Sequence, residues 1–395
     1  MNTAAADFVC LGPQPGNPAF GGSTTTPYQT FGSDPTATPP FNIFGTIPDL
    51  RTQRIHYYSA TIQHEVFKDS VITVSYIGTR GQNLLFERSL NNRQIGCWDD
   101  NNGGQQSGPA GSANNTTSLN CDRPFDSVFT TNVNGTLVPS YNYIMQLNND
   151  GYQRYNALQA SFRQRNWHNI NTQYNFTWSN CIDNNSTNRG GQAAIPLQTE
   201  NPYNPHDTQG PCDTDVRLNF NLGGTYTVPN ISSMGRLGEG WEIGGVFTAL
   251  TGRPFTARAG GDTSGQDQAV LRADCIAAPH YDYSQRTFIT NISEAFVDPV
   301  PGTIGTCGRN TLRGPGFRQF DANVLKTTRL SERFKLQFRW EVFNVLNHPN
   351  FSPSPGSANI DSGSFATSET TPDGLNPGVA QGSPRVMQFG LKLLF

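Results

Sequence analysis

Apolar and polar residues alternate with a period of two along much of this chain. In its last stretch, PRVMQFGLKLLF, Met387 and Phe389 fall on one side, whereas Gln388 and Lys392 fall on the other. A period of two is typical of a β-strand whose two faces meet different surroundings. The same pattern predicts nine strands, which cover residues 55–66, 70–80, 155–165, 168–179, 215–228, 241–250, 317–329, 333–347 and 384–395.

The predicted strands are long, and their two faces differ in chemistry. They have 10 to 15 residues each, whereas a strand in a soluble sheet has about 5–6, and a tilted strand that crosses a bilayer needs roughly 9–11. One side carries Phe220 and Phe338, and the other carries Asn219 and Arg339. We therefore expect lipid on the first side and water on the second.

The connections between the predicted strands alternate in length. The short ones are 67–69, 166–167 and 331–332, one of medium length covers 229–240, and the long ones are 81–151, 180–213, 251–316 and 349–384. This alternation is typical of an outer-membrane barrel, which has long extracellular loops and short periplasmic turns. Residues 82–90 and 141–147 are expected to extend one hairpin above the membrane. The fold class is therefore an all-β, antiparallel transmembrane β-barrel.

Composition agrees with this fold class and excludes several kinds of protein. Charged residues make up 14% of the 395 residues, against roughly 25% in a typical soluble domain. The net charge of −3 provides no basic field for nucleic acid. No apolar run is long enough for a membrane helix. We divide the chain into an irregular Gly/Pro-rich loop segment, 1–44, and a barrel segment, 45–395.

Six of the seven cysteines fall in pairs within long, polar connections. The pairs are Cys97 and Cys121, Cys181 and Cys212, and Cys275 and Cys307. One disulfide across each loop is the simplest connectivity, although six cysteines permit many others and unrelated free thiols are an alternative. Each disulfide would restrict the unfolded chain by roughly 3–4 kcal/mol on the entropic account.

The disulfides and the N-terminal sequence point to different compartments. Disulfides require an oxidising compartment, but MNTAAADFVCLGPQPGNPAF lacks the basic start and apolar centre of a secretion signal. We therefore expect the true N-terminus to lie upstream, and Cys10 to have its partner there.

The sequence contains no catalytic or metal-binding motif that we recognise. HExxH, GxSxG, GxGxxG and the phosphate-binding loop are absent, and the histidines are scattered. Residues 260–268 are faintly similar to a calcium loop, but a solvated loop fits them better. We therefore predict a protein that is not an enzyme and that holds no cofactor or metal.

Two groups of charged residues fall on the expected water side. Asp213 and Asp215 lie at the start of one strand with Arg217 nearby, and they predict an ion pair on the lumen side. A second group, Arg333, Lys335, Arg339 and Glu341, faces the predicted lumen. The second group could touch a plug or line a substrate path, and a hydrated barrel wall with paired charges is the alternative.

Four stretches, taken in order, resemble a known family. They are residues 47–84, residues 155–165 with 174–183, residues 213–229 with 240–257, and residues 308–351, which include FNVLNHPNF, with the final PRVMQFGLKLLF. They are similar to the C-terminal barrel half of TonB-dependent outer-membrane receptors. The best match is the Oar-like, acidobacterial type with a carboxypeptidase-regulatory-like domain.

The resemblance implies more than the residue pattern does. It implies a barrel of about 22 strands around a plug, in the cell outer membrane, driven by the TonB complex. Phe395, with Leu393, Leu391 and Phe389, would be the signal read by the barrel-assembly machinery. The plug would be missing here, so the chain would be a truncated gene product or half of a split receptor.

The implied function is binding and import of a bulky nutrient such as a siderophore, glycan or peptide. The partners would be outer-membrane lipid, the assembly machinery, the plug with the TonB complex, and the nutrient. A structural or adhesive surface barrel without transport is the main alternative, and a secreted β-sandwich lectin is a third possibility.

Overall fold

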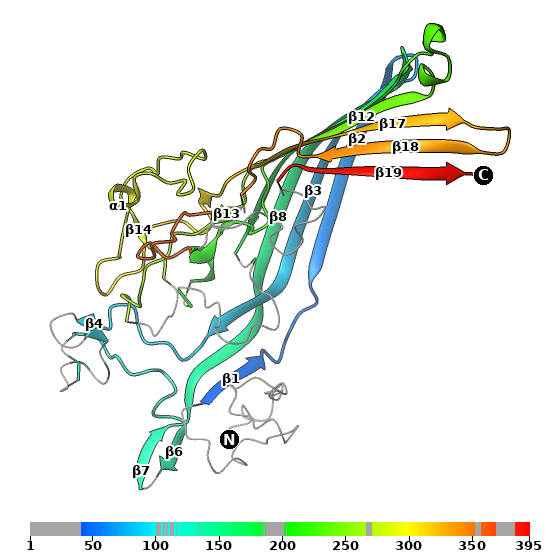
Figure 1. Ribbon diagram of the computed structural model, residues 1–395. Helices are drawn as coiled ribbons and strands as arrows, with labels where there is room; N and C mark the ends of the chain where they lie inside the picture. Colours follow the sequence, from blue (N-terminus) through cyan, green and yellow to red (C-terminus); the bar gives the residue numbers. More distant parts are fainter. Residues whose placement is uncertain are drawn as a thin grey trace.

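Nine long strands form one antiparallel sheet in the computed structural model (Figure 1). Across the sheet they are β19 (Val386–Leu394), β18 (Lys335–Phe343), β17 (Phe317–Arg329), β12 (Trp241–Leu250), β11 (Leu218–Thr227), β9 (Ile170–Asp183), β8 (Tyr141–Trp167), β3 (Ser70–Ser89) and β2 (Arg54–Phe67). Consecutive long strands pair with each other, so β2 and β19 form the two edges of an open sheet.

The structure describes most of the chain. The described residues are 41–99, 104–105, 107, 110, 114–115, 117–133, 135–184, 186, 201–202, 204–265, 271–351, 357–368 and 384–395. Cys10, most of the segment expected to be irregular, and the end of the calcium-like loop lie outside them. Among the described residues no helix is long and apolar enough to cross a membrane.

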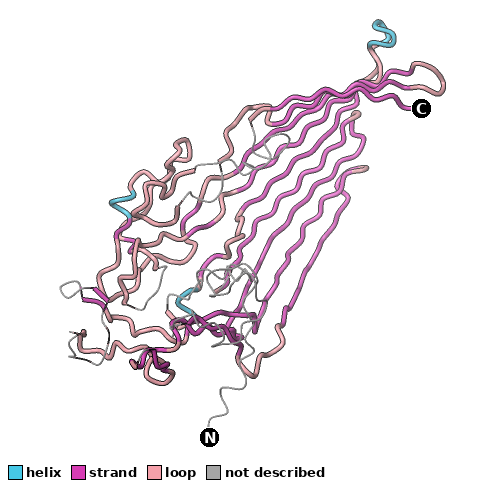
Figure 2. The backbone as a smooth tube through the Cα atoms, turned by 60° about the horizontal axis from the view of Figure 1, so that its bottom comes forward, coloured by secondary structure: helices cyan, strands magenta, loops and turns pink. Residues whose placement is uncertain are grey.

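All nine predicted strands are present, and two have the predicted bounds. β12 and β17 begin and end where the alternation does. β3 and β8 are longer than predicted, with 20 and 27 residues, because they continue to pair with each other as a ribbon up to Ser89 with Met145, where a short strand at residues 41–46 also pairs with β8. This ribbon confirms the expected hairpin extension. In both views the long loops gather at one end of the sheet and the short turns at the other (Figures 1 and 2).

The strand register collects the apolar residues on one face. Residues that are directly paired in an antiparallel sheet point to the same side. One row of paired residues across six strands is Ile72, Phe162, Tyr174, Leu222, Phe247 and Phe320. The adjacent row is Thr73, Ser161, Asn175, Asn221, Thr248 and Gln319. We call these two sides the apolar face and the polar face.

Among the described residues, no second layer covers the apolar face, which is exposed. At the C-terminal edge, the rings of Trp340 and Phe389 stack at 6.2 Å, and the exposed fractions of Phe389 and Leu391 are 69% and 70%. A large exposed apolar surface is costly in water. The prediction that Phe338 and Arg339 lie on opposite faces of the sheet is confirmed. Phe338 pairs with Leu391 of the apolar face, and Arg339 pairs with Gly390.

Lys326 is an exception on the apolar face, and its surroundings explain it. It pairs with Trp241 and Phe338 near the turn end of the sheet. Its ammonium group donates to the carbonyl of Arg236 at 2.8 Å and to that of Glu239, and it lies 5.5 Å from the Trp241 ring. The Lys326 ammonium group thus lies against backbone carbonyls of residues 236 and 239, at the turn end of the apolar face. Long basic side chains extend in this way to the polar boundary of a membrane.

A hydrophobic core lies within the loops, which the sequence pattern did not predict. Residues 251–265, 271–316 and 357–368 fold together, and we call them the loop module. Phe255, Phe288, Phe296 and Phe365 are its buried rings; the Phe296 and Phe365 rings meet at 5.5 Å. Its short elements are β13 (Pro254–Phe255), β14 (Asp274–Cys275), α1 (Ile292–Ala295), β15 (Phe296–Val297) and β16 (Leu312–Arg313).

Several short elements complete the described chain. They are β1 (Phe41–Thr46), β4 (Trp98–Asp99), β5 (Gly104–Gln105), β6 (Thr130–Val133), β7 (Thr136–Pro139), η3 (Pro205–Thr208), β10 (Gly210–Pro211) and η4 (Ser232–Leu237). β1 pairs in parallel with the start of β8. No strand was predicted at β1, which overlaps the end of the segment 1–44 that was expected to be irregular.

Candidate functional site

Three disulfides close three of the long loops. They are Cys97–Cys121, Cys181–Cys212 and Cys275–Cys307, which is the pairing that the sequence predicts. The second one lies at the loop end of β9, where the amide of Cys212 also donates to the carbonyl of Cys181 at 3.0 Å. This disulfide therefore fixes the loop that follows β9 against the sheet itself.

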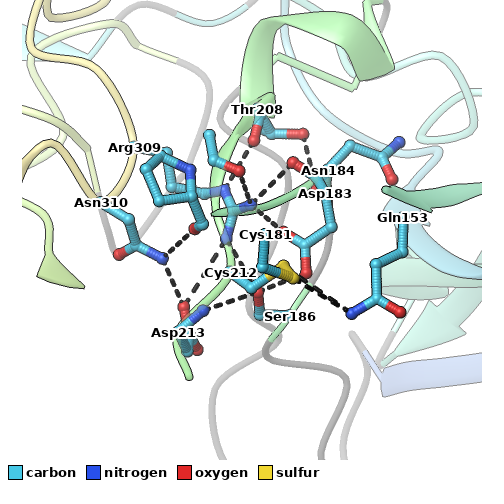
Figure 3. Close-up of polar contacts among 12 residues, drawn as sticks. Gln153, Cys181, Asp183, Asn184, Ser186, Thr208, Cys212, Asp213, Arg309 and Asn310 are labelled. Atoms are coloured by element: carbon cyan, nitrogen blue, oxygen red, sulfur yellow. Dashed lines mark hydrogen bonds and ion pairs between the residues drawn. A yellow bond between two sulfur atoms is a disulfide. The ribbon is translucent and has the colours of Figure 1, made fainter. Parts of the chain in front are cut away.

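Arg309 joins the loop module to the loop after β9 (Figure 3). Its Nε donates to the carbonyl of Thr208 at 2.6 Å, and its Nη2 donates to the carbonyl of Asp183 at 2.8 Å. Nη2 also forms an ion pair with the Asp183 carboxylate, whose side chain is only 6% exposed. The neighbouring Asn310 donates to Asp213 Oδ1 at 2.6 Å. These contacts hold two disulfide-closed loops together.

A second ion-pair cluster lies at the start of β11. Asp215 Oδ2 accepts from Arg217 at 2.7 Å and from Arg313 of the loop module at 2.5 Å, and Asp215 Oδ1 accepts from the Cys181 amide at 2.8 Å. The Asp215 side chain is fully buried, whereas that of Arg217 is 40% exposed. The predicted ion pair is confirmed for Asp215 with Arg217, with Arg313 as a further partner, whereas Asp213 lies 3.6 Å from Arg309 instead. Two guanidinium groups thus share the Asp215 carboxylate, whereas Arg309 lies between the carboxylates of Asp183 and Asp213.

A cavity opens on the polar face beside this cluster. Its volume is about 390 Å³, and we call it the niche. Besides Cys181 and Val216, its lining residues carry hydroxyl, amide or carboxylate groups: Thr79, Gln153, Tyr155, Thr177, Ser179, Thr214, Asp215 and Asn219. Such groups can donate and accept hydrogen bonds to a polar solute. The niche is therefore a candidate binding site at the junction of the sheet and the loops.

Two tyrosines of the loop module contact the backbone of Arg313. Tyr283 donates its hydroxyl to the Arg313 carbonyl at 3.2 Å, and the Arg313 amide donates to the Tyr281 hydroxyl oxygen at 3.3 Å. Burial raises the pKa of Tyr283 to about 12. A hydrogen bond from the Ser284 hydroxyl lowers the pKa of Asp282. At neutral pH this edge therefore presents neutral phenols and a charged carboxylate.

The predicted lumen residues lie on the polar face, apart from one. Lys335, Arg339 and Glu341 belong to β18 and share the side opposite Phe338. Arg339 Nη1 lies 3.9 Å from Glu341 Oε1. Arg333 lies in the turn before β18 rather than in the strand. None of these residues lines the niche, and their contact with a plug or substrate stays a prediction.

The predicted assembly residues lie at the sheet edge. Phe389, Leu391 and Leu393 are exposed on the apolar face of β19, and Phe395 follows the strand with 96% of its surface exposed. Their role as a signal stays a prediction.

Sequence reasoning missed Arg309 and Arg313 as site residues. Both lie in the stretch GRNTLRGPG, which carried the family resemblance, but neither belongs to an alternating pattern. Within the described part of the chain, no group of three or more His, Cys, Asp or Glu side chains could hold a metal ion.

Comparisons with known proteins found similar solved structures and one matching family. The fold is similar to the outer membrane transporter YddB from Escherichia coli, at 14% identity over 89% of this chain and 34% of that one, with a TM-score of 0.42. It is also similar to the FrpB iron transporter from Neisseria meningitidis, at 10% identity over 89% and 33%, with a TM-score of 0.39. A further similar structure is the siderophore receptor PirA from Acinetobacter baumannii, at 9% identity over 89% and 33%, with a TM-score of 0.40.

The chain spans about a third of the length of these solved structures. No curated protein matches it. One protein family matches residues 4–388 of this chain, and it is described as an outer membrane beta barrel domain. That match covers nearly the whole sheet and places the protein in the cell outer membrane, which rules out a secreted soluble lectin. The chain belongs to the outer membrane beta barrel domain family.

Proposed function

We propose that this chain forms part of the wall and the extracellular cap of a TonB-dependent receptor of the Oar-like type. The receptor binds a bulky nutrient, such as a siderophore, glycan or peptide, and imports it without covalent chemistry. The observation that carries the proposal is the niche, because it lies on the polar face at the loop end of the sheet. A solute captured by the loops meets this site before it passes along the polar face.

The loops around the niche are held in place, which suits a binding site. Arg309 and Arg313 tie the loop module to residues 183 and 215 at the end of the sheet. A preformed site spends less binding free energy on ordering its own loops. Farther toward the turns, Lys335, Arg339 and Glu341 line the same face with exposed or half-buried charges. These groups would keep a path through the barrel hydrated.

The partners follow from the two faces of the sheet. Outer-membrane lipid would cover the apolar face, since many of its apolar side chains are exposed in the described part of the chain. A plug and the TonB complex would act from the lumen and the periplasm. The exposed apolar residues of β19 would be read by the barrel-assembly machinery.

A pair of variants at adjacent positions tests transport through the niche. Asn219→Trp places an indole into the niche, whereas Phe220→Trp places the same group on the apolar face. We expect Asn219→Trp to lower uptake roughly tenfold, or about 1.4 kcal/mol, and Phe220→Trp to leave it unchanged. The measurement is uptake of radiolabelled ferric siderophores, oligosaccharides and oligopeptides by cells that express the protein.

The same cells separate transport from adhesion. A protonophore should abolish the uptake that Asn219→Trp lowers, because TonB action depends on the proton gradient. The proposal would be contradicted if Asn219→Trp and Phe220→Trp took up the nutrient equally well and the protonophore left this uptake unchanged. Loss of cell attachment under those conditions would favour the structural or adhesive barrel instead.

A further inference from the structure

A second cavity lies in the loop module, away from the niche. Its volume is about 700 Å³, and we call it the groove. The groove is formed around α1, which lies at the outer edge of the loop module, away from the long strands (Figures 1 and 2). No residue lines both the groove and the niche. The groove is therefore a separate candidate site.

The floor of the groove is the outer surface of the module's hydrophobic core. Ile289 and Phe296 belong to that core and are almost fully buried, and Ile292 and Ile360 pack against it. All four also line the groove. Apolar side chains of a ligand would lose contact with water on this floor, and apolar burial is the main favourable term in most binding reactions.

The rim of the groove is acidic. Asp298 and Asp361 line it, and among the described residues no lysine, arginine or histidine does. Both carboxylates lie beside Gly260: the Gly260 amide donates to Asp298 Oδ1 at 3.4 Å, and a β-carbon at Gly260 would lie 2.0 Å from Asp361 Oδ2. Neither carboxylate forms an ion pair within the described residues. Arg286, next to the lining residue Gln285, donates instead to the Ser368 carbonyl at 3.2 Å.

An apolar floor beside two neighbouring carboxylates defines the chemistry of an occupant. Like charges held close together repel each other, and a cation between them removes that cost. Lysine and arginine side chains form charge-assisted hydrogen bonds with carboxylates. The hydroxyls of Thr287 and Thr290 also line the groove and can bond to a peptide backbone. We propose that the groove binds an extended peptide segment in which lysine or arginine alternates with aliphatic residues.

This inference rests on the proposed function and gives it a substrate class: the bulky nutrient is a cationic peptide, first captured at the groove. The test uses the full chain in detergent micelles and the fluorescein-labelled peptide Val-Lys-Leu-Arg-Val. Fluorescence anisotropy is expected to show binding that weakens with added salt, since screening acts on exposed charges. Peptides with glutamine or glutamate at the two basic positions are expected to bind at least fivefold more weakly.

Three variants assign this binding to the two carboxylates. Asp298→Asn combined with Asp361→Asn is expected to weaken the Val-Lys-Leu-Arg-Val complex at least fivefold. Glu294→Gln removes a charge from α1 that does not line the groove, so it should change the affinity less than twofold. Gly260→Ala keeps every charge but displaces the Asp361 carboxylate, and it should weaken binding at least threefold.

Two outcomes would overturn the proposal. The first is equal affinity of the original protein for the basic, glutamine and glutamate peptides, or equal affinity of the double variant and the original protein for the basic peptide. Circular dichroism must show that the double variant and the original protein are both folded. The other is calcium binding, seen by calorimetry with calcium chloride alone, that the double variant abolishes and that peptides do not affect.

The groove and the proposed transport function can fail separately. Peptide binding to the purified protein without energised uptake by cells would keep the groove and refute transport. Uptake of another nutrient that Asn219→Trp blocks, with no peptide binding in micelles, would keep transport and refute the groove.

Discussion

Replacing Leu222 by Arg is expected to destabilise the folded protein in a bilayer by about 2–4 kcal/mol. Leu222 lies in the middle of β11 on the apolar face, where it pairs with Tyr174 on one side and Phe247 on the other. A guanidinium group there would have to enter the hydrocarbon or distort the sheet to reach water. The measurement is a guanidinium chloride titration of the protein reconstituted in phosphatidylcholine vesicles.

The adjacent position provides the matched control. Asn221→Arg introduces the same side chain one residue away, on the polar face, where Asn221 now accepts a hydrogen bond from the Thr248 hydroxyl at 3.2 Å. We expect a change below about 1 kcal/mol, as for most surface substitutions. If Asn221→Arg were the more damaging variant, the two faces would be assigned the wrong way round.

Replacing Arg309 by Ala is expected to lower the local stability of the loop after β9 by about 3–5 kcal/mol. Removing one partner of a buried ion pair leaves the other charge uncompensated, and the Asp183 side chain is only 6% exposed. The carbonyls of Thr208 and Gly210 would also lose the guanidinium donor. Hydrogen exchange measures this stability amide by amide, and the loss should appear at residues 204–215.

Two further variants separate this loss from a general effect of losing an arginine. Arg339→Ala removes a partner from a pair 3.9 Å apart whose arginine is 49% exposed, so the change should stay below about 1 kcal/mol. Asp183→Asn combined with Arg309→Ala removes the uncompensated charge and should restore part of the protection. Equal exchange in Arg309→Ala and the original protein would refute the role of Arg309 in joining the loops.

The sequence alone predicted the sheet because its information is local. Whether a strand residue faces lipid or water depends on its own position in the alternation, so Leu222 and Asn221 could be assigned without knowledge of any partner. The bounds of β12 and β17 follow from the same pattern. The three disulfides were also within reach, since each closes a single loop.

The strand ends were predicted less well where tertiary pairing extends or shortens them. β9 continues to Asp183, beyond the predicted end at residue 179, because β10 pairs with it and the Cys181–Cys212 disulfide lies there. β1 pairs in parallel with a strand about a hundred residues later, as Phe41 with Tyr141 shows. No property of residues 41–46 alone indicates that partner.

Only the tertiary structure decided what the loops do. Phe255 and Phe365 belong to different loops, yet their rings pack 6.2 Å apart in one core. Arg309 and Asp183 are 126 positions apart in the chain, and the groove combines residues near α1 with Asp361. Periodicity records which surroundings each residue prefers, and it therefore determined the two faces of the sheet. It carries no information about which distant residues meet, so the loop module, the niche and the groove required the folded chain.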